Sequence, residues 1–76
     1  MQVNFHDALI HALYAYRAMT AMRDTVEHIL SDAEFHAVDQ MIQSVPRWDK
    51  QADLYRKVAY MIGDGASVQE VVECLI

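Results

Sequence analysis

The chain has 76 residues, of which six are lysine or arginine and eleven are aspartate or glutamate, so its net charge is −5 with neutral histidines. Hydrophobic residues make up 54% of it, interrupted by only two glycines and one proline, a composition that excludes a disordered chain, a collagen-like repeat and a Gly/Ser linker. The sequence therefore predicts one small domain, near the size below which a core needs a disulfide, a metal or a partner to be stable.

The first predicted helix covers residues 5–30, with Asn4 as its N-cap and Asp7 in its first turn. At 100° per residue, one broad apolar stripe should face the core: Phe5, Ala8, Leu9, Ala12, Tyr16, Met19, Val26 and Leu30. A helix of about 26 residues is ~39 Å long, whereas a compact domain of this size is roughly 30 Å across. We therefore expect this helix either to bend near Thr20 or to be covered by a second copy of the chain.

Three further helices are predicted, over residues 32–44, 47–62 and 67–75. Ser31 with Glu34, and Ser67 with Glu70, match the capping box, in which each side chain satisfies a free amide of the other residue. Pro46 separates the second helix from the third, because proline cannot continue a helix. A Gly-Asp-Gly segment then ends the third helix, because glycine adopts the left-handed cap conformation without steric cost.

The three shorter helices are also amphipathic. Their predicted core positions are Phe35, Val38, Met41, Ile42 and Val45, then Trp48, Ala52, Tyr55, Val58, Ala59 and Ile62, and finally Val68, Val71, Val72 and Leu75. No window alternates with a period of two residues, which disfavours strands. The sequence therefore predicts an all-α, four-helix domain whose neighbouring helices pack antiparallel.

The small size of the core favours a homodimer through the first helix. Ala8, Ala12 and Ala15 would allow a second helix to approach closely. The single cysteine, Cys74, cannot form an internal disulfide, and no secretion signal or membrane span is recognisable. We therefore expect a cytoplasmic protein.

Aspartate and histidine are spaced i, i+4 three times, as Asp7/His11, Asp24/His28 and Asp32/His36. Each pair could supply two metal ligands, but a zinc or di-iron site needs at least three that converge. We therefore expect ion pairs on helix surfaces and no metal or other cofactor. Because no nucleophile or oxyanion-binding group accompanies these pairs, we also expect that the protein is not an enzyme.

The third helix is the only basic element. Residues 31–46 carry a net charge of −3, whereas residues 47–57 carry +2 and contain Arg47, Lys50, Arg56 and Lys57. The segment Asp64-Gly65-Ala66-Ser67-Val68-Gln69-Glu70-Val71 is similar to the DGxSxxEV opening of helix-turn-helix motifs in recombinases and regulators. This resemblance implies a nucleic-acid-associated regulator. We nevertheless expect no direct DNA reading, because no recognition helix follows and the net charge is repelled by DNA.

Apolar residues outside the core stripes indicate where a protein partner binds. On the first helix, opposite its core face, a small apolar patch has a polar rim, and on the third helix a tyrosine lies among charges. The predicted partner-binding residues are Ile10, Tyr14, Arg17, Ala21, Arg56 and Tyr60. A second interpretation is that a dimer mate or the fourth helix covers the patch on the first helix.

In size and charge the chain resembles the small acidic helical proteins that phages and mobile elements use to block or redirect a host protein. This resemblance implies a non-enzymatic interaction module that inhibits or modulates a larger protein, such as a transcriptional regulator. Two alternatives are a nucleic-acid-associated regulator that uses the basic third helix and a structural subunit of a larger assembly.

Overall fold

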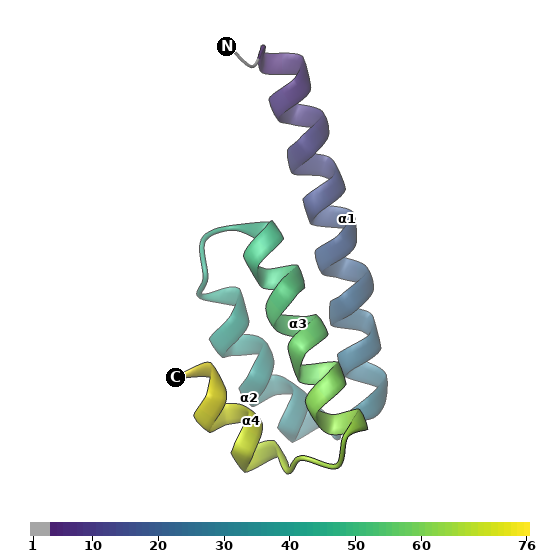
Figure 1. Ribbon diagram of the computed structural model, residues 1–76, viewed down its shortest axis with the longest axis vertical. Helices are drawn as coiled ribbons and strands as arrows, with labels where there is room; N and C mark the ends of the chain where they lie inside the picture. The colour runs from purple at the N-terminus through teal and green to yellow at the C-terminus, as the bar shows by residue number, and fades with distance from the viewer. Residues whose placement is uncertain (1–3) are drawn as a thin grey trace.

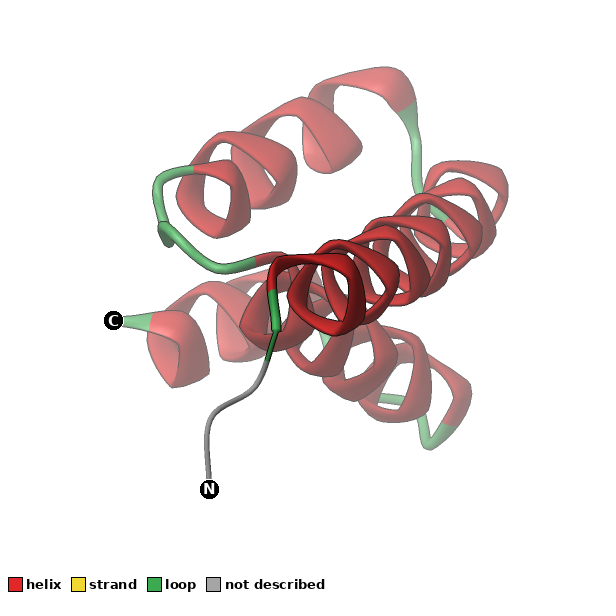
Figure 2. Ribbon diagram, turned by 90° about the horizontal axis from the view of Figure 1, so that it is seen from above, coloured by secondary structure: helices red, strands yellow, loops and turns green. Residues whose placement is uncertain are grey.

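The computed structural model describes residues 4–76 (Figure 1). It contains the helices α1 (Phe5–Ile29), α2 (Asp32–Gln43), α3 (Trp48–Gly63) and α4 (Val68–Leu75). The described residues form no strand, which confirms the all-α class (Figure 2). Each observed helix end lies within one residue of the predicted one. None of these helices combines the length and the apolar character that a membrane crossing requires.

The predicted caps set the helix ends. The side chain of Asn4 accepts a hydrogen bond of 2.8 Å from the backbone amide of Asp7, and complete capping boxes form at Ser31 and Ser67. Gly65 follows the end of α3 with a φ angle of 95°, a conformation that costs glycine little and other residues much. Local side-chain chemistry therefore determines where α1, α2 and α4 begin, whereas α3 begins at Trp48 without a side-chain cap.

The packing of α1 differs from the expected antiparallel pairing. Consecutive helices alternate in direction, but the most extensive packing joins α1 to α3, which run the same way along the molecule (Figure 1). The molecule measures 44 × 22 × 20 Å and its radius of gyration is 13.9 Å, against about 11 Å for a compact chain of this length. The excess is the N-terminal half of α1, which passes through Thr20 as an uninterrupted helix and projects beyond the bundle.

The core lies where α1, α2 and α3 meet and is closed by one residue of α4. Its buried apolar members are Met19, Val26, Phe35, Val38, Ile42, Ala52, Tyr55, Val58 and Val71. Five predicted core residues are instead exposed: Phe5 and Ala8, together with Leu9 (46%), Tyr16 (44%) and Trp48 (43%). The prediction was wrong for Phe5, Ala8 and Leu9 because α2 and α3 are too short to reach the first turns of α1. Tyr16 and Trp48 contact each other where α3 begins, at the exposed end of the bundle.

A polar network at the centre of the bundle ties three helices together. Buried Tyr55 of α3 donates a hydrogen bond of 2.5 Å to Asp39 of α2 and accepts one of 2.8 Å from Gln43. Arg23 of α1 donates two hydrogen bonds, of 2.7 and 3.1 Å, to the same carboxylate. Its guanidinium also lies 5.3 Å from the ring centre of Phe35, within the range of a cation–π contact.

The network shifts the ionisation of its members. Burial acts to raise the pKa of Asp39, but the hydrogen bonds from Arg23 and Tyr55 outweigh it and hold this pKa below its ordinary value. Burial and the hydrogen bond to Asp39 raise the pKa of Tyr55 to about 12. The folded protein therefore stabilises a charged aspartate and a neutral tyrosine.

Replacing Tyr55 by phenylalanine should lower the free energy of unfolding by about 1.5–3 kcal/mol, because a buried hydrogen bond to a charged group is lost. In a domain of this size the melting temperature should fall by roughly 6–20 °C. Tyr60, on the exposed side of the same helix, provides the matched control, and Tyr60→Phe should change stability by less than about 0.5 kcal/mol. Equal stability of the two variants in urea denaturation would contradict a structural role for the network.

The alkaline stability of the protein should also depend on Tyr55. Its folded-state pKa of about 12 exceeds its ordinary value of 10.0, so its contribution is complete below pH 10 and is lost as the pH rises through 12. The difference in unfolding free energy between the wild type and Tyr55→Phe should therefore shrink between pH 10 and 12. A difference that stays constant across this range would show that Tyr55 titrates alike in both states.

Candidate protein-binding surface

The projecting half of α1 is rich in exposed apolar side chains. No residue from 5 to 18 is buried, and Phe5, Tyr14 and Leu13 are 84%, 67% and 51% exposed. Soluble monomers rarely show large contiguous apolar areas outside binding sites. The projecting half is therefore the first candidate for an interaction surface.

Three of the predicted partner-binding residues meet on one side of this segment. Ile10, Tyr14 and Arg17 line an open hollow of about 340 Å³ together with Leu13. Ala21 lies one turn further along the same helix face and is also exposed. Within residues 4–76 no ion pair includes Arg17, so its guanidinium is free to bind a carboxylate of a partner.

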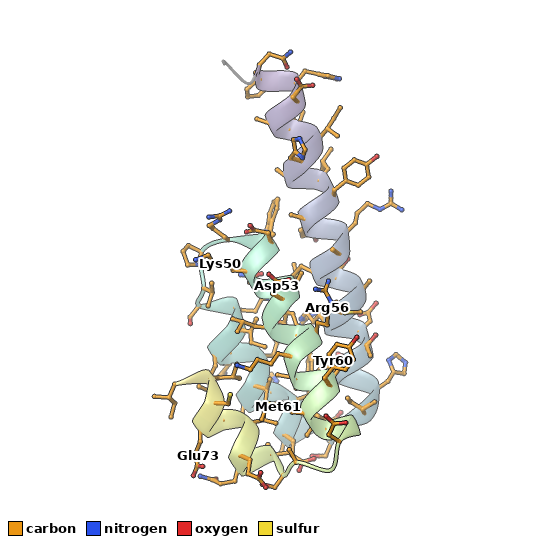
Figure 3. The ribbon with its side chains drawn as sticks, viewed as in Figure 1. Lys50, Asp53, Arg56, Tyr60, Met61 and Glu73 are labelled. Carbon is orange, nitrogen blue, oxygen red and sulfur yellow. The ribbon has the colours of Figure 1, made fainter. Side chains whose placement is uncertain are left out.

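The other two predicted residues form a separate group on α3. Arg56 and Tyr60 line a second hollow with Met22 of α1 and with Ala59. Tyr60 is 69% exposed, and Lys50, Asp53 and Arg56 precede it along the outer side of α3 (Figure 3). Five of the six predicted residues therefore line two separate hollows, with Met22 as the α1 member of the second, and Ala21 lines neither.

Carboxylates pair with two of the four basic side chains of α3 and its N-cap residue, Arg47. Arg47 pairs with Asp49 at 2.6 Å, and Arg56 pairs with Asp53 at 3.1 Å. These are exposed pairs, which contribute little to stability. Among the residues that the structure describes, Lys50 and Lys57 are therefore the basic side chains of α3 that form no ion pair.

The three aspartate–histidine pairs do not form the predicted ion pairs within residues 4–76. The Nδ1 atom of His28 instead lies 2.7 Å from the backbone carbonyl oxygen of Asp24, one helical turn earlier. Exposed ion pairs contribute little to stability, so these pairs give the helices little when they do form. No group of three or more possible metal ligands occurs in the part of the chain that the structure describes.

Periodicity predicted that Ala12, Tyr16 and Trp48 belong to the core. In the structure Ala12 and Trp48 instead line a third hollow, and Tyr16 lies at its edge. Tyr16 and Trp48 pack edge to face, with ring centres 4.8 Å apart. Beside them, an open hollow of about 530 Å³ is lined by His11, Ala12, Ala15, Pro46, Arg47, Trp48 and Asp49. In the sequence, the predicted first helix is longer than a compact domain of this size is wide. This length indicated that the apolar stripe of the helix extends beyond the core.

Comparison with protein-family models, with curated proteins and with solved structures finds no significant match to this chain.

Proposed function

We propose that this protein is a non-catalytic interaction domain that binds a larger protein and modulates it. The observation that carries the proposal is the exposed side of α1, where Tyr14 and Arg17, which forms no ion pair within residues 4–76, border an apolar hollow. Tyrosine and arginine are the residues most enriched among the energetic centres of protein interfaces, because each gives a large contact area with a polar tip. Ala21 extends this surface with a small side chain that allows close approach to the helix.

The second hollow lies further along α1, between α1 and α3. Met22, which lines it, is five residues from Arg17, which places it about 7.5 Å along the axis of α1 and roughly 140° around it. One partner contacts both groups if it curves around α1, with Arg56 and Tyr60 at the edge of the interface.

The charge of the chain favours a basic partner. A net charge of −5 speeds association with positively charged surfaces and opposes association with nucleic acid. Proteins that bind nucleic acid carry such surfaces. We therefore propose a transcriptional regulator or a similar nucleic-acid-binding protein as the class of partner, whose basic regions speed association while one of its carboxylates pairs with Arg17. A cytoplasmic location is part of this proposal.

We also propose that the domain acts as a homodimer through α1. The accessible surface of 5479 Å² exceeds by several hundred Å² the roughly 4,700 Å² expected of a compact monomer of this mass. The projecting half of α1, in which no residue from 5 to 18 is buried, contributes to this excess.

Replacing Tyr14 by alanine should weaken binding of the partner by about 30-fold, or roughly 2 kcal/mol. Stability should change by less than about 0.5 kcal/mol, because the side chain is 67% exposed. Affinity capture from native cells with mass spectrometry identifies the partner, and calorimetry with the purified partner measures the effect. Gln40→Ala on the exposed side of α2 is the control. Full affinity of the Tyr14→Ala protein would place the interface elsewhere.

The charge-reversed variant Arg56→Glu/Lys57→Glu tests binding of nucleic acid by α3. Because carboxylates already pair with two of the four basic side chains, the wild type should show no salt-dependent binding to duplex DNA, and the variant should not differ from it. Fluorescence anisotropy across a range of salt concentrations measures this. Binding by the wild type that weakens with salt and is lost in the variant would favour the nucleic-acid-associated regulator.

A further inference from the structure

The core-facing stripe of α1 continues past the end of the bundle without a change of spacing. Phe5, Leu9, Ala12 and Tyr16 follow one another at intervals of four, three and four residues, and Met19 and Val26 continue the same heptad pattern. Met19 and Val26 are buried against α2 and α3, whereas Phe5 is 84% exposed. The upper part of the stripe therefore has the pattern of a helix interface but no partner in the chain itself.

We infer that a second copy of the chain covers this stripe, with the two α1 helices antiparallel along Phe5, Leu9, Ala12 and Tyr16. The inference rests on the proposed homodimer and specifies its contact face and its orientation. It concerns a different face of α1 from the one that carries Tyr14. One copy can therefore bind its mate and a larger protein at the same time.

Steric exclusion determines the orientation. Below Tyr16 the stripe is covered by α3 of the same chain, whose first residue, Trp48, packs against Tyr16. A parallel second helix would bring its own α3 to the same level, where the two bundles would collide. An antiparallel helix avoids this, because its bundle lies beyond Phe5 of the first copy. The twelve residues from Phe5 to Tyr16 span about 18 Å, which is the length that the two helices share.

The side chains fit this antiparallel register. Phe5 of one copy lies at the level of Tyr16 of the second copy, and Leu9 lies at the level of Ala12 of the second copy. Each layer thus pairs an a position with a d position, as in antiparallel coiled coils, and the Leu–Ala layers allow close approach. The tip of α1 reaches the hollow beside Trp48, so Phe5 of one copy joins the Tyr16–Trp48 pair of the other.

The available area is most of what a stable dimer needs. Since an aromatic side chain buries roughly 150–250 Å², the exposed parts of Phe5, Leu9, Tyr16 and Trp48 sum to about 400 Å² of apolar surface per copy. A standard interface buries about 800 Å² per partner, of which about two thirds is apolar in homodimers. The stripe carries no charged side chain, so its burial leaves no charge unpaired.

Disulfide trapping tests the arrangement. Phe5→Cys and Tyr16→Cys are made separately in the full chain, with exposed Cys74 replaced by serine. On mild oxidation, a mixture of the two variants should give a cross-linked dimer, whereas each variant alone should stay uncross-linked. Cross-linking of each variant alone would show a parallel dimer, which overturns the orientation but leaves the homodimer intact. If the protein is a dimer but neither the mixture nor either variant alone forms a cross-link, the proposed register is wrong.

Sedimentation of two charge variants tests the face. Leu9→Lys places a charge in the stripe and should raise the dissociation constant of the dimer about 100-fold, since both copies lose a central contact. Ala18→Lys, at an exposed position on the opposite side of the helix, should leave the dimer intact. Circular dichroism should show full helicity in both. Equal effects of the two variants overturn the contact face. A wild type that sediments as a monomer of 8.7 kDa would overturn the homodimer. The proposed interaction function would still hold in that case if binding of the larger protein depends on Tyr14.

Discussion

The ion pair of Arg23 with Asp39, held in place by Tyr55, determines how the helices of this domain lie relative to one another. A carboxylate that receives hydrogen bonds from both α1 and α3 can do so in only one register of the three helices. Breaking one partner of such a network leaves a partly buried charge uncompensated, which costs more than the intact pair contributes. The network therefore specifies the arrangement more than it adds to its stability.

That register explains the shape of the molecule. With Arg23 level with Asp39, the first α1 residue inside the core is Met19. The partner helices α2 and α3 have 12 and 16 residues and α1 has 25. The excess length can only extend beyond one end of the bundle, and the network places it at the N-terminus. The exposed apolar stripe follows from this mismatch of lengths and not from a lack of hydrophobic residues.

The sequence predicted well what depends on neighbouring residues and poorly what depends on distant ones. Helix ends were predictable because caps such as Ser31 act within four residues. The polar network was not, because its members are 12 to 16 residues apart in the chain. The burial of Gln51 was not predicted either. Its side-chain amide donates a hydrogen bond to the backbone carbonyl of Val45, between α2 and α3, a contact that helical periodicity does not indicate. Helical periodicity identified the apolar face of each helix. Which part of the face of α1 is buried depends on the lengths of α2 and α3, which pack against it.

The continuity of α1 has a consequence for the entropy of association. An isolated segment as short as residues 5–18 would be only marginally helical in water, because nucleation is costly. In this protein the buried half of α1 is already helical, so the projecting half only extends an existing helix. Asn4 caps its N-terminus. The projecting half is thus ordered before it meets a partner. Little conformational entropy is then lost on binding, so a contact of modest area can still give a stable complex.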